Sequence, residues 1–198
     1  MIRINKTGIR KIAVTAILAA MSSVLMFINF SIPIMPSFIK VDFSELPALV
    51  ASFTMGPIYG VLVCLIKNLV NLFQTSTMGI GELSNFILGS IFVFSAGLIY
   101  KHRKNRKSAL LGAVIGSSLM ACIGLFTNYF LVYPIYENFM PLEAIVGMYK
   151  AIYPGVKDLF HALLIFNVPF TFLKGMANTL ITFLIYKKIS PIIKGSKF

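Results

Sequence analysis

Long stretches without any charged side chain are the feature that most constrains how this chain folds. Five of them lack Asp, Glu, Lys and Arg entirely: residues 12–28, 46–66, 83–100, 109–136 and 175–186. An apolar run of about 18 residues is long enough for a helix to cross roughly 30 Å of hydrocarbon. Only 12% of the residues are charged and 58% are hydrophobic, which leaves too few charges to cover a water-exposed surface. The sequence therefore predicts an all-α integral membrane protein rather than a soluble domain.

The formal net charge of +12 comes from basic residues that flank the apolar runs. They gather in the leader that ends at Lys11, in the cluster from Lys101 to Lys107, and in the C-terminal tail. A nucleic-acid-binding protein carries its positive charge on a soluble face, and this chain has no such face. We predict no nucleic-acid partner, and we assign the basic residues to the cytoplasmic side of a bilayer.

The first apolar run has two interpretations. It is either a retained transmembrane helix over about 10–29 or a secretory signal that is removed. Its core is longer than the usual signal, and no clear small-x-small cleavage site precedes the loop with Pro33 and Pro36. The retained helix is the working interpretation, with its basic leader in the cytoplasm.

The run 46–66 decides the topology. If it crosses the membrane once, the cluster from Lys101 to Lys107 falls outside, against the positive-inside rule. Gly56-Pro57 is a strong helix punctuator, and a break there returns the cluster to the cytoplasm. The first piece, 45–55, is then about 16 Å long, so we expect neighbouring helices to shelter it from lipid.

A single transmembrane domain over residues 1–198, with six helices and both termini cytoplasmic, sorts the charges well. The helices are expected at about 10–29, 45–55, 57–74, 82–101, 108–133 and 168–188. Thirteen of the 18 Lys and Arg then lie on the cytoplasmic side and all six acidic residues on the outer side. An external loop covers 31–45, and an external segment of short helices covers 134–166, where three prolines interrupt the chain.

Two lysines lie inside the predicted spans, where ionisable groups are costly and usually functional. Lys67 is in the middle of the helix 57–74, and Lys174 is in the outer half of the last helix. Asn167, Thr171 and Asn178 recur with Lys174 at spacings of three and four, so they share one helix face. Such a polar stripe must face protein or water rather than lipid.

Further polar residues lie at the outer ends of other helices. Glu82 and Asn85 are three apart at the start of one helix, and Asn128 lies at the end of the next. Val41 and Asp42 belong to the external loop. We expect these groups to converge into a polar pocket that opens from the outside.

Structural explanations remain open for some of these residues. Lys67 can simply pair with Glu82 or Asp42, and Asn68 and Asn71 can form interhelical hydrogen bonds. Ser44 can serve as the cap of the helix that begins at 45.

The first helix carries a small-xxx-small pair, Ala16 and Ala20, with Ala13 nearby. Small faces let helices approach closely. This face either packs within the same bundle or docks another membrane subunit.

No pattern for catalysis or for metal binding is present. Cys64 and Cys122 lie in apolar runs, and His102 and His161 have no ligand-like spacing to Cys, Asp or Glu. Neither a phosphate-binding loop nor a Gly-x-Ser-x-Gly elbow occurs. We therefore predict no metal, no cofactor and no enzymatic activity.

Several motifs together resemble the substrate-binding (S) components of energy-coupling-factor (ECF) vitamin transporters, specifically the riboflavin type. They are Ile39-Lys40-Val41-Asp42-Phe43-Ser44-Glu45-Leu46-Pro47, Gly56-Pro57, Lys67-Asn68, Gly81-Glu82-Leu83-Ser84-Asn85-Phe86, Asn128-Tyr129-Phe130 and Pro169-Phe170-Thr171-Phe172-Leu173-Lys174-Gly175. The resemblance implies a six-helix fold in the plasma membrane that captures the vitamin from outside. It also implies association with a transmembrane coupling subunit and two cytoplasmic ATPase subunits.

The resemblance further implies which residues hold the ligand. The isoalloxazine edge is expected on Asn128, Thr171 and Lys174, beneath the loop that carries Asp42. The full set of expected binding residues is Val41, Asp42, Glu82, Asn85, Asn128, Phe170, Thr171 and Lys174. The position of Thr171 resembles a family asparagine, so one ring contact differs. A different vitamin or flavin analogue on the same fold is the nearest alternative, and a structural subunit without ligand is another.

Overall fold

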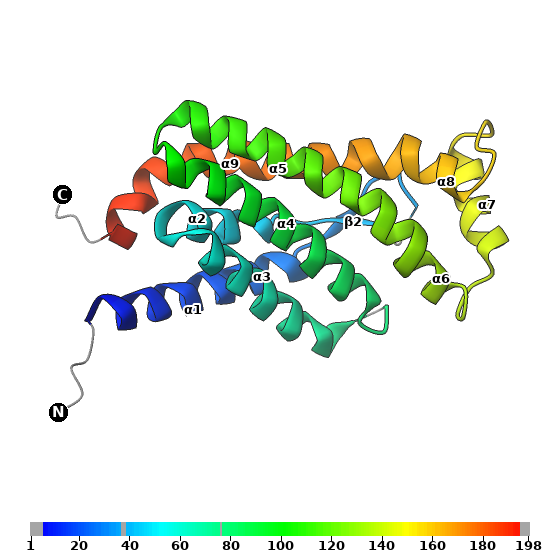
Figure 1. Cartoon of the computed structure of the whole chain (residues 1–198). Helices are drawn as coiled ribbons and strands as arrows, with labels where there is room; N and C mark the ends of the chain where they lie inside the picture. Colours follow the sequence, from blue (N-terminus) through cyan, green and yellow to red (C-terminus); the bar gives the residue numbers. More distant parts are fainter. Residues whose placement is uncertain (1–5, 37–38, 76, 195–198) are drawn as a thin grey trace.

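The computed structural model describes residues 6–36, 39–75 and 77–194, which form an elongated helical bundle (Figure 1). The long helices are α1 (Lys6–Phe27), α3 (Pro57–Asn71), α4 (Ile80–His102), α5 (Arg106–Thr127) and α9 (Val168–Lys194). The shorter ones are α2 (Glu45–Met55), η1 (Leu72–Gln74), α6 (Tyr133–Tyr136), α7 (Leu142–Ile152) and α8 (Leu159–Ala162). The start of α1 and the end of α9 lie at one end of the bundle, and α7 and α8 lie at the other.

Five helical stretches among the described residues are long and apolar enough to cross a membrane. They are Gly8–Phe27, Pro57–Gln74, Ile80–His102, Arg106–Tyr136 and Leu159–Pro191. Three of them are composite. Pro57–Gln74 joins α3 to the 3-10 turn η1, and the π-helical turns η2 (Asn128–Val132) and η3 (Leu163–Asn167) join α5 to α6 and α8 to α9. Each π turn lets the helix continue past an irregular step instead of ending there.

The break between α2 and α3 falls at Gly56. Its φ of +118° lies in the region that only glycine adopts readily, and Pro57 follows as the first residue of α3. All residues from Glu45 to Phe53 are buried, because α2 packs against α1, α3, α4 and α9. A helix of 11 residues is too short to cross hydrocarbon, and the bundle keeps it away from lipid.

Small residues let the central helices pack closely. Gly97 of α4 faces Ser52 of α2, and a Cβ at Gly97 would collide with the Ser52 hydroxyl. That hydroxyl donates a hydrogen bond of 2.6 Å to the carbonyl of Val93 on α4. On the other face of α4, Gly112 of α5 approaches the carbonyl of Ala96. Helix α4 therefore lies between α2 and α5 in a tightly packed core.

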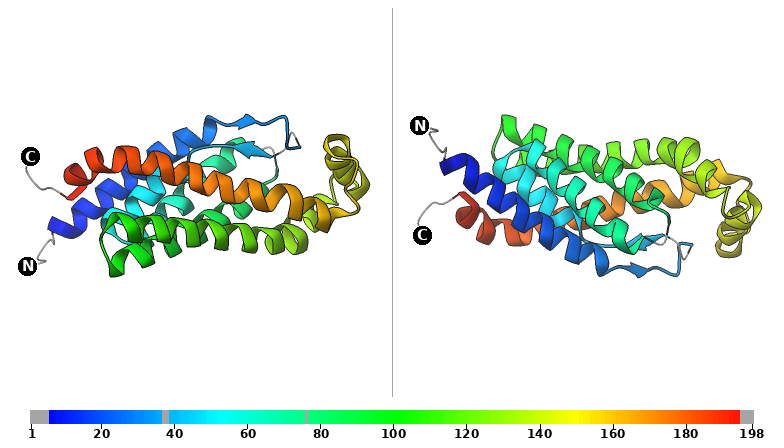
Figure 2. Two further views of the ribbon diagram at one scale, coloured as in Figure 1. Left: turned by 90° about the horizontal axis from the view of Figure 1, so that it is seen from above. Right: turned by 90° about the horizontal axis from the view of Figure 1, so that it is seen from below.

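The external loop contains a short two-stranded β ribbon, which the predicted all-α fold did not include. Strands β1 (Phe30–Ser31) and β2 (Lys40–Val41) pair antiparallel, with Phe30 opposite Val41. Figure 2 shows this ribbon beside α9, in the half of the bundle away from the start of α1 but short of α7 and α8. Asp42 follows β2 directly and forms an ion pair with Lys174 of α9.

The final helical stretch begins earlier than the expected 168. Asp158 starts α8, since its carboxylate accepts a hydrogen bond of 2.8 Å from the backbone N–H of His161. The chain then runs through η3 into α9 without a gap. Residues 159–167, expected in the external segment, therefore belong to a long continuous helix.

Candidate functional site

A cavity of about 170 Å³ lies close to the β ribbon, since Ile39, the residue before β2, is one of its walls. It lies between α4, the α5–α6 stretch, the η3–α9 stretch and the segment before α2. Its walls are Ile39, Glu45, Gly81, Ser84, Asn85, Leu88, Met120, Asn128, Val132, Tyr133, Tyr136, Asn167, Phe170, Thr171 and Lys174. Apolar and aromatic walls with a few polar groups are typical of a small-molecule site.

Four polar side chains predicted from the sequence meet in this cavity: Asn85, Asn128, Thr171 and Lys174. They come from α4, from η2 and from α9, so only the folded bundle brings them together. The amide oxygen of Asn85 is buried and has no hydrogen-bond partner among the described residues. A buried acceptor without a partner is costly, and a ligand with an N–H or O–H group would satisfy it.

Lys174 belongs to a chain of four alternating charges. Its ammonium nitrogen is 2.9 Å from Asp42 Oδ2 and 3.5 Å from Glu45 Oε2. The other oxygen of Glu45, Oε1, is 3.0 Å from the ammonium nitrogen of Lys67. Lys67 and Asp42 both hydrogen-bond to the Ser44 hydroxyl, which donates to Asp42 and accepts from Lys67. We call Asp42, Lys174, Glu45 and Lys67 the charge quartet.

The charge quartet is electrically neutral, and this neutrality makes it possible to bury. The side chains of Lys67 and Glu45 are 0% and 2% exposed, and those of Lys174 and Asp42 are 10% and 7% exposed. Burial alone would raise the pKa of the Asp42 carboxyl. The ammonium groups of Lys174 and Lys67 and the hydrogen bonds from Ser44 and Lys174 outweigh it, so the pKa of Asp42 lies well below its ordinary value.

The quartet corrects one expectation. Lys67 was expected to pair with Glu82 or Asp42, and its ion-pair partner is Glu45 at the start of α2. Ser44 precedes α2 as expected of a cap, yet its hydroxyl makes no capping bond and belongs to the quartet instead.

Glu82 is outside the cavity walls. Its Oε1 accepts a hydrogen bond of 2.9 Å from the Asn71 amide, and its Oε2 accepts bonds of 2.9 and 3.1 Å from Thr75 and Thr77. These hydrogen bonds attach the start of α4 to the end of α3 and to the segment between them. The Asn71 bond is interhelical, whereas the Asn68 amide donates within its own helix to the carbonyl of Cys64.

The remaining predicted residues occupy two places. Phe170 lines the cavity beside Thr171. Val41 and Asp42 do not line it, but Asp42 reaches the cavity through its ion pair with Lys174. The loop that carries both residues is therefore tied to α9 at the cavity edge.

Tyrosines and Asn167 build a wall of the cavity that the site prediction did not include. The Tyr149 hydroxyl donates a bond of 2.8 Å to the amide oxygen of Asn167, and it lies 2.7 Å from the Tyr133 hydroxyl. Tyr149 belongs to α7, and burial raises the pKa of its hydroxyl far above the ordinary value. The network attaches α7 to η3 and α6, so the segment outside the long helices helps to close the cavity.

The small face of α1 points away from the bundle. Ala13, Ala16 and Ala20 are all exposed, whereas Leu18 on the opposite side of the helix is 5% exposed. The three alanines are therefore not occupied by packing within this chain.

The cavity holds no candidate metal centre. Among the described residues, no group of three or more His, Cys, Asp or Glu side chains lies close enough together to hold an ion.

Comparison with known proteins gives consistent matches over nearly the whole chain. The family model for the substrate-specific component of ECF transporters matches residues 10–186. "Riboflavin transporter RibU" of Staphylococcus aureus is 30% identical over 193 residues, which are 97% of this chain and 96% of that protein. "Riboflavin transporter FmnP" of Bacillus subtilis is 29% identical, over 96% of each chain.

A further relative and a solved structure agree with these matches. "Riboflavin transporter RibU" of Streptococcus thermophilus is 33% identical, over 94% of this chain and 86% of that protein. A solved structure described as the S component of a bacterial ECF transporter has a TM-score of 0.73 and 30% sequence identity. It covers 93% of this chain and 97% of that one.

Proposed function

This chain belongs to the substrate-specific components of ECF transporters, and we propose that it captures riboflavin at the cell surface for uptake. It is a multi-pass protein of the cell membrane. Its role is binding and delivery, with no chemistry on the ligand.

The observation that carries this proposal is the extent of the similarity. The match to a relative named a riboflavin transporter covers 97% of this chain at 30% identity, so the ligand site and the rest of the bundle are both included. The cavity chemistry supports the same ligand class. A flavin is a flat apolar ring system with one polar edge, and the cavity has apolar walls with polar groups from three elements.

We place the polar edge of the ring against Asn128, Thr171 and Lys174. Asn128 both donates and accepts hydrogen bonds, and Lys174 donates to a ring carbonyl. Asn85 supplies the unpaired buried acceptor. Phe170 forms part of the wall. A site that hydrogen-bonds its ligand rejects analogues that leave those groups unpaired.

Ligand entry requires the loop 31–45 to move. The cavity is about 170 Å³, below the roughly 300–1,000 Å³ of drug-sized ligand sites. The loop is attached to α9 at Asp42, through the ion pair with Lys174. We therefore propose that the loop opens for entry and closes again on the bound ligand, with Asp42 near the ribityl hydroxyls.

The topology and partners extend the same proposal. We propose six spans, with α2 and α3 forming separate helices and both termini in the cytoplasm, because this arrangement follows the positive-inside rule. A transmembrane coupling subunit and two cytoplasmic ATPases supply the energy. The exposed alanines of α1, Ala13, Ala16 and Ala20, are the proposed docking face for the coupling subunit.

One observation favours a ligand other than riboflavin: residue 171 is a threonine, where the family resemblance implies an asparagine. A hydroxyl at this position offers a different hydrogen-bonding pattern from an amide, so a flavin analogue or a different vitamin would be discriminated here.

The decisive experiment is to purify the protein in detergent and record its visible absorption spectrum. A flavin spectrum, with riboflavin released on denaturation, supports both the ligand class and the cavity. A colourless protein that also fails to quench the fluorescence of added riboflavin rejects riboflavin and favours the alternative ligand.

A further inference from the structure

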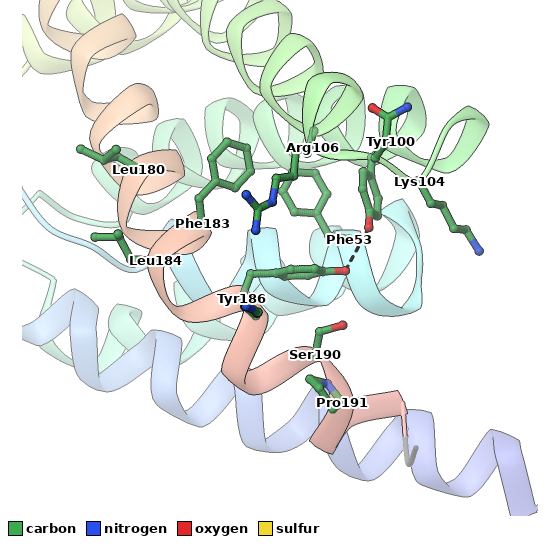
Figure 3. A pocket seen from close by; sticks show the side chains of 13 residues that line it. Phe53, Tyr100, Lys104, Arg106, Leu180, Phe183, Leu184, Tyr186, Ser190 and Pro191 are labelled. Atoms are coloured by element: carbon green, nitrogen blue, oxygen red, sulfur yellow. Dashed lines mark hydrogen bonds between the residues drawn. The ribbon is translucent and has the colours of Figure 1, made fainter. Parts of the chain in front are cut away.

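A second and larger cavity lies at the opposite end of the bundle, where α1 begins and α9 ends (Figure 3). Its volume is about 610 Å³. Its walls are Phe53, Tyr100, Lys104, Asn105, Arg106, Ala109, Leu180, Phe183, Leu184, Tyr186, Lys187, Ser190 and Pro191. None of these residues takes part in the proposed vitamin site, so this cavity needs its own explanation.

The rim of this cavity is positively charged and has no acidic partner. Lys104, Arg106 and Lys187 line it, and no described carboxylate forms an ion pair with any of them. Arg106 also opens α5, where the helix dipole already places positive charge and favours an anion. Three cations that line one cavity without a described acidic partner favour an anionic occupant.

The floor of the cavity is a fixed aromatic cluster. The Phe53 ring centre is 4.9 Å from that of Tyr100 and 6.1 Å from that of Tyr186. The two tyrosine hydroxyls are 3.3 Å apart and hydrogen-bond to each other (Figure 3). Because the rings pack on one another, they form an apolar base rather than an open slot for a flat ligand.

One side wall of the cavity opens towards lipid. Leu180 and Leu184 of α9 are 64% and 72% exposed, and both line the cavity together with Phe183. Large leucines exposed on a membrane-spanning helix are compatible with contact with hydrocarbon. An occupant can therefore extend from the charged rim along apolar side chains into the bilayer.

The cavity also lies at the level of the bundle where the apolar spans end. Its charged residues lie where three apolar spans end, after His102, at Arg106 and near Pro191. Lipid head groups lie at this level, and basic pockets between helices bind their phosphates.

We propose that this cavity binds an anionic phospholipid, with its phosphate at the basic rim that Lys104, Arg106 and Lys187 line and an acyl chain along Leu180 and Leu184. The basic rim attracts the phosphate, and the leucine wall selects an amphiphile over a soluble anion. This site is independent of vitamin binding and requires only that the bundle spans a membrane.

The absence of tryptophan from the sequence allows a direct test. The variant Phe183→Trp places a single fluorescent reporter in the cavity wall, and Phe126→Trp places one on an exposed part of α5 far from it. Each is reconstituted in bilayers that contain equal mole fractions of acyl-brominated phosphatidylglycerol or phosphatidylcholine. We expect the bromines of phosphatidylglycerol to quench the Phe183→Trp reporter with a relative binding constant about tenfold higher. The Phe126→Trp reporter is expected to show no such preference.

Charge removal then separates the cavity from general surface attraction. In the Phe183→Trp background, Lys104→Gln, Arg106→Gln and Lys187→Gln together should abolish the preference. The matched control, Lys101→Gln, Arg103→Gln and Lys107→Gln, removes three exposed cations of the same region that do not line the cavity. It should retain most of the preference. Circular dichroism melting of each variant identifies any that fail to fold, and single substitutions at Lys104 and Lys187 then replace the triple variant.

Three results would overturn the proposal. The first is equal quenching of the Phe183→Trp reporter by the two lipids, which would show that the cavity does not prefer an anionic lipid and would favour a protein partner as its occupant. The second is an equal loss of preference in both triple variants, which would reduce the effect to diffuse surface charge. The third is relief of quenching by millimolar glycerol 3-phosphate, which would identify a soluble phosphate rather than a lipid as the occupant.

Discussion

Removing Lys67 should destabilise the protein far more than removing an ordinary surface charge. The Lys67 side chain is 0% exposed, and its ammonium nitrogen is 3.0 Å from Glu45 Oε1. At an effective dielectric constant of about 20, this separation corresponds to an attraction of about 5 kcal/mol. The variant Lys67→Met keeps the volume but leaves the charge quartet with a net negative charge. Breaking a buried ion pair on one side costs about 3–5 kcal/mol.

The expected effect on melting follows from that cost. For a chain of this size, 1 kcal/mol shifts the melting temperature by roughly 2–4 °C, so Lys67→Met should melt at least about 6 °C below the parent. Cys64 provides the assay, because it is buried in α3 one turn before Lys67 and becomes reactive only on unfolding. A thiol-reactive dye reports this exposure during heating. The exposed Cys122 is replaced by Ala in every protein, including the parent.

Two further variants make the test specific to the buried charges. Lys150→Met removes an exposed lysine and should leave the melting temperature within about 1 °C of the parent. The double variant Lys67→Met with Glu45→Gln removes one charge of each sign, so the Asp42–Lys174 pair remains neutral. It should melt above the Lys67→Met single variant. If Lys67→Met melts with the parent, or if the double variant melts no higher than the single one, the reasoning on charge balance is wrong.

The other predictions concern the ligand site, the docking face and pH. Lys174→Ala and Asn128→Ala should each weaken riboflavin binding by about 1–3 kcal/mol, measured by quenching of riboflavin fluorescence, and unchanged affinity in both would reject the site. Leucine at Ala16 and Ala20 together should abolish riboflavin uptake by cells while leaving binding to the purified protein intact. Persistent uptake would mean that this face does not dock the coupling subunit. The pKa of the Asp42 carboxyl is lower in the folded protein than in the unfolded chain. Ionised Asp42 therefore stabilises the fold fully above about pH 4, and this stabilisation is lost as the pH falls below that value. Asp42→Asn should flatten the melting temperature in that acidic range, and an unchanged slope would show that another carboxyl is responsible.

Features that depend on local residue chemistry could be predicted from the sequence. Gly56-Pro57 interrupts a helix through its own backbone requirements, and the structure ends α2 and begins α3 there. The spacing of Thr171 and Lys174 places them on one helix face, and both line the cavity. Such inferences need only the helical period and the properties of glycine and proline.

Pairings between elements could not be predicted in the same way. Lys67 was expected to pair with Glu82 or Asp42, and only the rotation of α3 against α2 selects Glu45. The side chain of Glu82 shares a helix with Asn85, yet the rotation of α4 turns it to Asn71, Thr75 and Thr77. Sequence spacing gives relative positions on one helix and no information about which neighbour each face meets.

The π turns η2 and η3 could not be predicted from the sequence either. Each contains five residues, and nothing in their composition distinguishes them from ordinary helix. Their effect on the site is large, because Asn128 begins η2 and Asn167 ends η3. A wider helical turn changes the direction of the side chains around it, and π turns often occur at functional sites. The cavity therefore forms at the irregular turns of two otherwise regular helices.

In the function proposed above, Lys174 would link ligand recognition to loop closure, because its ammonium group has enough N–H donors for both. Its ammonium group has three N–H bonds, and in the structure one donates to Asp42 at 2.9 Å while Glu45 lies at 3.5 Å. A ring carbonyl of the ligand can take a remaining N–H without displacing Asp42. Binding would then add a partner to Lys174 rather than exchange one for another. In this proposal the ion pair that attaches the loop to α9 is kept in the occupied site, so ligand binding and loop closure would favour each other.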